Sequence, residues 1–65
     1  MKYLIFRLQD KADGNFLLEC DNLAREDTTE KETATAKLIE ESIQFLLHSL
    51  DKDKIIKINY SKVIE

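Results

Sequence analysis

One long amphipathic segment, residues 27–50, constrains the fold of this 65-residue chain more than any other feature. Its apolar side chains recur at steps of three and four residues, a spacing that places them on one stripe of an α-helix. Burial of each large aliphatic side chain stabilises a fold by roughly 1.5–3 kcal/mol, so we expect this stripe to form the core. The stripe consists of Ala36, Ile39, Ile43, Leu46, Leu47 and Leu50.

The start of this helix carries a capping signal. Thr29 followed by Glu32 is a capping box, in which the hydroxyl accepts from a free amide and the carboxylate reaches back. Asp27 and Glu30 have the same spacing two residues earlier, so the first helical residue stays open. The carboxylates of Asp27, Glu30 and Glu32 lie near the N-terminal end of the helix, where the positive end of the helix dipole stabilises negative charge.

A second apolar group projects from the opposite side of the predicted helix. Ala34, Leu38 and Phe45 lie away from the main stripe at about 100° per residue. One sheet cannot cover both sides of a helix, which leaves two interpretations. In the first, Leu38 and Phe45 are partly exposed, which is normal for single apolar residues at a surface, or Phe45 packs under a loop. Alternatively, the pair forms a contact surface for another chain.

Three other segments alternate apolar and polar residues, and this pattern predicts β-strands. Between the first two, Gly14 after Asp13 predicts a tight turn and therefore a hairpin. Residues 22–28 have no clear period and are either a polar crossover or a short third strand. The order β-β-α-β predicts an α+β fold, with one long helix packed on one face of a small antiparallel sheet. The alternating segments are residues 2–9, 15–21 and 54–64.

The length predicts a single small domain, residues 1–65, with a modest core. Ordering entropy of about 1.5 kcal/mol per residue nearly cancels what such a core contributes. Cys20 is the only cysteine, so no disulfide helps, and one His with one Cys makes a metal site improbable. We therefore expect dimerisation or partner binding to contribute to stability.

No motif indicates catalysis or a bound cofactor. His48 is interpreted as a surface histidine, because no partner is placed to make it a base. Cys20 continues an apolar alternation and is interpreted as a buried structural thiol. Glu40 and Glu41 diverge on a helix, and nothing predicts that either is desolvated for acid–base work. One glycine cannot build a phosphate-binding loop, so the chain is not expected to be an enzyme.

Charge indicates the kind of partner. The net charge is −3, and acidic side chains concentrate in residues 19–32. An acidic middle favours a basic protein partner and disfavours nucleic acid. The competing nucleic-acid surface would be one sheet face, where Lys54, Lys57, Lys62 and Tyr60 of the last strand accompany Arg7 and Tyr3 of the first.

The location predicted for the chain is cytoplasmic. No segment is apolar enough to span a membrane, and residues 1–10 lack a signal-peptide pattern. The unpaired Cys20 fits a reducing compartment.

The hairpin and helix resemble the N-terminal domain of HicB-like antitoxins. The resemblance rests on an initial Met1-Lys2-Tyr3 strand, an Asp13-Gly14-Asn15-Phe16 turn, a second strand and a Thr-initiated helix. It departs where the family shows a Leu-Pro-Gly type segment and this chain has Asn22-Leu23-Ala24-Arg25. The resemblance implies a domain that binds a small partner protein, without a DNA-binding half.

The function predicted from these features is an acidic protein-binding module, inhibitor or antitoxin-like, that occupies a basic partner surface. Chains of this size and charge are common in phage and mobile elements. The alternatives are a homodimeric scaffold and a weak nucleic-acid binder. The predicted partner-binding residues are Glu26, Asp27, Glu30, Glu32, Leu38 and Phe45.

Overall fold

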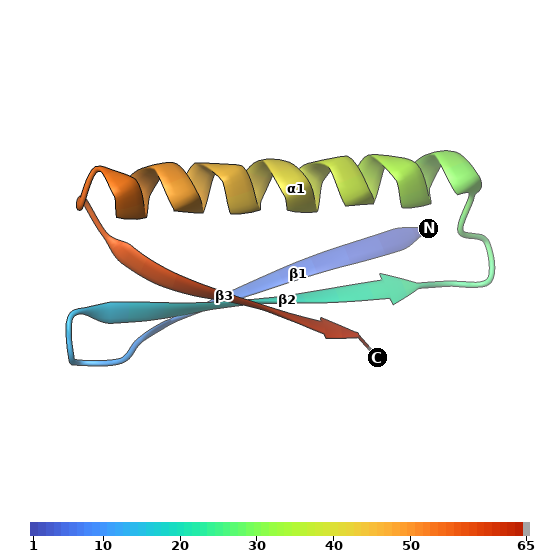
Figure 1. Cartoon of the computed structure of the whole chain (residues 1–65). Helices are drawn as coiled ribbons and strands as arrows, with labels where there is room; N and C mark the ends of the chain where they lie inside the picture. Colours follow the sequence, from blue (N-terminus) through green and yellow to red (C-terminus); the bar gives the residue numbers. More distant parts are fainter. Residues whose placement is uncertain (65) are drawn as a thin grey trace.

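The computed structural model describes residues 1–64, with side chains for residues 1–63, and this part of the chain forms one helix and a three-stranded sheet. The order is β1 (Lys2–Asp10), β2 (Asn15–Ala24), α1 (Glu30–Lys52) and β3 (Lys57–Ile64). Figure 1 shows α1 lying along one face of the sheet, which confirms the predicted α+β fold and its element order.

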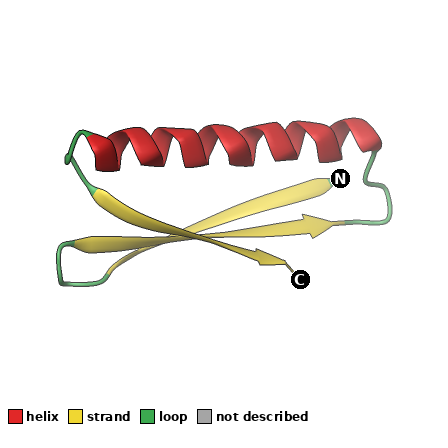
Figure 2. Ribbon diagram, viewed as in Figure 1, coloured by secondary structure: helices red, strands yellow, loops and turns green. Residues whose placement is uncertain are grey.

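The sheet is mixed, so the prediction of an antiparallel sheet is wrong for its third strand. β2 is central, with β1 antiparallel on one side and β3 parallel on the other. The reason is the crossover helix: its 23 residues span about 35 Å, the length of β2, and return the chain to the end where β2 began. Figure 2 shows this return, with α1 running above the strands for their full length.

The hairpin turn is built as the sequence predicts. Gly14 has a φ of 86°, a left-handed conformation that glycine adopts without a steric penalty. The Asp10 carboxylate accepts from the Ala12 amide at 2.9 Å, and the Asp13 carboxylate accepts from the Asn15 amide at 3.0 Å. These local bonds satisfy the backbone where the two strands reverse direction.

The segment that the sequence left open, residues 22–28, divides into two parts. Its first three residues extend β2 to Ala24, which pairs with Lys2 at the start of β1. The remainder is a short loop, held where the Arg25 amide donates to the Met1 carbonyl at 3.1 Å. It is therefore the end of β2 followed by a short polar crossover to the helix, and not a separate third strand.

The predicted capping box starts the helix. Thr29 is the N-cap: its hydroxyl accepts from the Glu32 amide at 3.1 Å, and the Glu32 carboxylate accepts from the Thr29 amide at 2.9 Å. These two bonds satisfy two amides that the first helical turn cannot pair. They settle the open choice of start in favour of Glu30 as the first helical residue.

The helix ends in a Schellman arrangement with an unusual residue. The Lys54 amide donates to the Asp51 carbonyl, and the Ile55 amide donates to the Leu50 carbonyl, both at 3.0 Å. This geometry requires a left-handed residue after the C-cap, and Lys54 adopts it with a φ of 57°. A side chain in this conformation costs roughly 1–2 kcal/mol, which glycine would avoid.

The buried side of α1 differs from the predicted stripe. Ala36 and Glu40 are buried, whereas Ile39 is 43% and Leu46 is 58% exposed. The stripe is rotated because Glu40 finds hydrogen-bond partners in the sheet, described below. A single helix, about 10 Å wide, is also narrower than the three strands, which occupy about 14 Å at about 4.8 Å per strand. The side chains that face the sheet are Ala36, Glu40, Ile43, Leu47 and Leu50.

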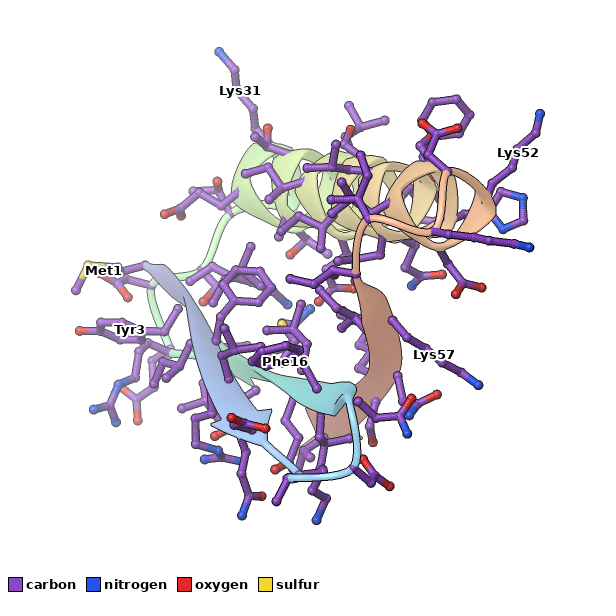
Figure 3. All side chains as sticks on the ribbon, turned by 90° about the vertical axis from the view of Figure 1, so that its left-hand side faces the viewer. Met1, Tyr3, Phe16, Lys31, Lys52 and Lys57 are labelled. Atoms are coloured by element: carbon purple, nitrogen blue, oxygen red, sulfur yellow. The ribbon has the colours of Figure 1, made fainter. Side chains whose placement is uncertain are left out.

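The resulting core is small. The Cα trace measures 41 × 20 × 11 Å, an elongated slab, and Cys20 and Ala36 are the only apolar residues in residues 1–63 that are buried. Figure 3 looks along the helix and shows Phe16 between the two layers, while Tyr3 points outward from β1. Much apolar surface therefore stays in contact with water.

We predict that Lys54→Gly raises the free energy of unfolding by about 1 kcal/mol, because it removes the side chain from a left-handed position. Urea denaturation measures this change. Lys52→Gly is the control, since residue 52 is still helical and glycine there should destabilise the fold. An equal loss of stability in both variants would contradict the assigned helix end.

Candidate protein-binding surface

The side of α1 that faces away from the sheet is apolar and open. Phe45 is 75% exposed and Leu38 is 64% exposed, so both members of the predicted pair lie at the surface. Ile39 and Leu46 extend this surface toward β1. No charged side chain interrupts it between residues 34 and 50. We call it the charge-free face; it consists of Thr35, Leu38, Ile39, Ser42, Phe45, Leu46 and Ser49.

Three hydroxyl residues run along the middle of the charge-free face at intervals of seven. Thr35, Ser42 and Ser49 each donate a hydrogen bond to the carbonyl oxygen four residues earlier, at 2.8, 2.8 and 3.2 Å. Their polar hydrogens are thus satisfied within the helix. Burial of a hydroxyl costs free energy mainly when its hydrogen bond is lost. These three residues can therefore be buried against a partner with little loss of free energy.

The four predicted acidic residues gather at the N-terminal end of α1, but two of them already have partners. Asp27 accepts from the Met1 amino group, and this bond lowers the pKa of the Asp27 carboxyl. Hydrogen bonds from Thr29 lower the pKa of Glu32, which belongs to the capping box. Glu26 and Glu30 are exposed to solvent.

The structure does not combine the acidic and apolar halves of the predicted site into one compact surface. Along the helix axis Leu38 is about 9 Å from Glu32, and Phe45 is about 20 Å away, at about 1.5 Å per residue. A partner that contacts Phe45 would therefore reach the carboxylates only if it also extended along almost four helical turns.

A buried polar cluster that the sequence interpretation missed joins α1 to the sheet. Glu40 is 4% exposed, and its carboxylate accepts from Asn22 Nδ2 at 2.7 Å and from Lys62 Nζ at 2.9 Å. Burial alone would raise the pKa of Glu40, but these hydrogen bonds and the Lys62 charge outweigh burial and lower it. Glu40 is therefore a buried, charged anchor rather than a surface carboxylate.

A signal for this cluster was present in the sequence. Glu40 lies four residues after Ala36 and three before Ile43, so it shares their side of the helix. The thiol of Cys20 lies 3.8 Å from Glu40 Oε1. Cys20 is fully buried, as predicted, and burial raises the pKa of its thiol, which makes it a poor nucleophile.

The open face of the sheet is held by its own ion pair. Arg7 on β1 donates two hydrogen bonds to Asp21 on β2, at 2.7 and 3.0 Å. This bidentate pairing leaves Asp21 buried although no helix covers it. On the same face the Arg25 guanidinium lies 5.5 Å from the centre of the Tyr3 ring.

The basic residues of the competing nucleic-acid surface are dispersed. Lys62 is paired with Glu40 beneath the helix. Tyr60 aligns with Leu18 of β2, on the side of the sheet that faces α1, and burial raises the pKa of its hydroxyl to about 12. Lys57, one strand position from Ile58, lies on the other side. Arg7 and Tyr3 share the open face with Lys57, whereas Tyr60 and Lys62 lie on the opposite face, so the predicted set does not form one surface.

An open hollow of about 350 Å³ lies between Gly14 and the loop after α1, and its lining holds a single carboxylate, that of Asp51. Within residues 1–64, no group of three or more His, Cys, Asp or Glu side chains is placed to hold a metal ion. No helix in this described part of the chain combines the length and apolarity needed to cross a membrane.

Comparisons of the chain with protein-family models, curated proteins and solved structures find no match.

We predict that Glu40→Gln lowers the free energy of unfolding at pH 7 by about 1–3 kcal/mol, because it weakens hydrogen bonds to a buried charge. The folded-state pKa of Glu40 lies below its ordinary value of 4.5, so the carboxylate stabilises the fold above that pH. This contribution disappears as pH falls through the folded-state pKa. Urea denaturation from pH 7 downward should therefore show a shallower acid loss in Glu40→Gln.

Glu41→Gln is the matched control, because Glu41 is adjacent in sequence and exposed. It should keep the stability and the acid profile of the unmodified chain. A Glu40→Gln variant whose stability follows the unmodified chain through the acid range would show that the buried carboxylate does not anchor the helix.

Proposed function

We propose that the chain is a protein-binding module that acts through the charge-free face of α1. The exposure of Phe45 and Leu38 on a side of the helix without charges carries this proposal. Contiguous apolar patches of several hundred Å² are uncommon on monomeric proteins and mark interaction sites. The described cavities and side-chain clusters offer no comparable support for catalysis.

The physical reason for binding is the removal of apolar surface from water. Each Å² of buried apolar surface contributes roughly 25 cal/mol. The hydroxyls on the charge-free face already donate within the helix, so a partner needs to supply few polar groups. A partner with a matching apolar surface is therefore favoured over a highly charged one.

An inhibitor or antitoxin-like role is the narrower form of this proposal. Glu26 and Glu30 are exposed beyond the N-terminal end of the charge-free face, where they would attract basic groups of a partner. Asp27 and Glu32 contribute less, because the Met1 amino group and Thr29 occupy them. We place the module in the cytoplasm, where the free thiol of Cys20 would stay reduced.

We predict that the double variant Leu38→Ala/Phe45→Ala keeps its fold and loses its protein partners. The side chains are exposed in the monomer, so their truncation should shift the melting temperature of dilute protein by only a few degrees. Tagged forms of the unmodified chain and of the variant would be used to capture proteins from the producing cells. The captured proteins, including untagged copies of the chain, are then quantified by mass spectrometry.

Glu41→Ala/His48→Ala is the matched control, because it has the same seven-residue spacing on the charged side of α1 and should retain every partner. Two results would contradict the proposal. The first is capture of the same proteins in the same amounts by Leu38→Ala/Phe45→Ala. The second is a collapse of its melting temperature in dilute protein, where lost association cannot be the cause, which would make the pair part of the core.

A further inference from the structure

We infer that the partner of the charge-free face is a second copy of this chain, with the two α1 helices antiparallel and a two-fold axis beside Ser42. This inference rests on the proposed function, since it uses the same surface, but it commits to one occupant. Four observations support it: the excess surface of the monomer, the shape of the face, the placement of two charges, and the small core.

The monomer exposes more surface than a folded chain of its mass. Its accessible surface is 5072 Å² for 7.6 kDa. The relation between mass and surface for folded monomers gives about 4,300 Å², which leaves an excess on the order of 800 Å². A stable interface of standard size buries about 800 Å² per partner. One contact with a second copy would therefore bring the surface to the value expected for this mass.

The shape of the charge-free face suits a close helix–helix contact. On a helix of about 100° per residue, Thr35, Ser42 and Ser49 fall within about 40° of one another and form a straight central line. Large side chains flank the line on both sides: Leu38 and Phe45 on one, Ile39 and Leu46 on the other. Small residues along the centre let two helices approach, and the larger ones interdigitate at the edges.

An antiparallel copy matches this face with itself. A two-fold axis beside Ser42 places each residue opposite the one equally far on the other side of Ser42. Thr35 then lies opposite Ser49 of the second copy, so small residues meet at both ends of the central line. The two-fold axis keeps each flank on its own side of the line, so the apolar residues pair as Leu38 with Phe45 of the second copy, and Ile39 with Leu46 of the second copy.

Charges at the two ends of the central line select the antiparallel direction. Lys31 precedes the line at the N-terminal end of α1, and Asp53 follows it as the C-cap. Figure 3 shows Lys31 pointing away from the sheet. Each charge is at the unfavourable end of its own helix dipole, positive at the N-terminus and negative at the C-terminus. In an antiparallel pair, Lys31 lies beside Asp53 and the negative helix end of the second copy.

A parallel pair lacks this complementarity. It would place Lys31 beside Lys31 and Asp53 beside Asp53, and like charges at an interface are repulsive. The parallel pair would also align the two helix dipoles. The same residues therefore favour one orientation of the second copy and disfavour the other.

The small core gives dimerisation a role in folding. Only Cys20 and Ala36 are buried apolar residues among residues 1–63, so the monomer has little to offset its ordering entropy. Association that buries the charge-free face would stabilise the folded state by mass action. The melting temperature should accordingly rise with protein concentration.

We predict that sedimentation equilibrium of the purified chain, with no other protein present, detects a dimer. Ser42→Glu should abolish the dimer, because it places two carboxylates at the two-fold axis. Gln44→Glu is the control, since Gln44 lies on the β3 side of α1 and the same charge there should leave the dimer intact. A monomer at every concentration up to about 1 mM, the limit of a very weak complex, would overturn the inference.

Disulfide trapping tests the antiparallel orientation of the two helices without adding a charge at the interface. Ser42→Cys should link to itself under mild oxidation. Thr35→Cys and Ser49→Cys should each remain unlinked alone and link when mixed. The native Cys20 is fully buried and does not compete. Self-linkage of Thr35→Cys as readily as Ser42→Cys would overturn the antiparallel arrangement.

Charge exchange provides an independent check by rescue. Lys31→Glu and Asp53→Lys should each weaken the dimer by roughly five-fold, because two symmetric ion pairs become repulsive. The combined variant should restore the affinity, and failure of this rescue would overturn the pairing. A purely monomeric chain that still captures other proteins through Leu38 and Phe45 would refute self-association and leave the proposed function standing.

Discussion

The contact on which the rest of the structure depends is the hydrogen-bonded carboxylate of Glu40 beneath the helix. It accepts from Asn22 on β2 and from Lys62 on β3, at 2.7 and 2.9 Å. A buried charge is strongly destabilising when unpaired, so these bonds fix the rotation of α1 about its axis. The rotation turns Glu40 toward the sheet and moves Ile39 from the sheet toward the exposed flank.

The exposed apolar surface follows from this rotation. With Glu40 inward, Ile39 and Leu46 move to the flank, next to Leu38 and Phe45, and the charged residues occupy the other flank. The helix is too narrow to cover three strands, so the core cannot absorb the displaced side chains. A polar anchor inside and an apolar face outside are thus two consequences of one helix orientation.

The sequence could predict local structure better than its tertiary consequences. The cap at Thr29 and the turn at Gly14 depend on neighbouring residues, and both agree with the structure. Helical geometry placed Phe45 opposite the main stripe but left its exposure open, and the structure shows it 75% exposed. The burial of Glu40 depends on Lys62, which is distant in sequence, so helical periodicity alone could not establish it. The parallel pairing of β3 could have been deduced from the length of the crossover helix.

The central claim is that α1 presents Leu38 and Phe45 to solvent in the monomer and that a second copy covers them. The most direct measurement is NMR of the chain with a soluble paramagnetic agent at increasing protein concentration. We expect the resonances of Leu38 and Phe45 to be broadened at low concentration and protected at high concentration, while those of Glu41 and His48 stay broadened throughout. Protection of Phe45 at every concentration, or at none, would contradict the account.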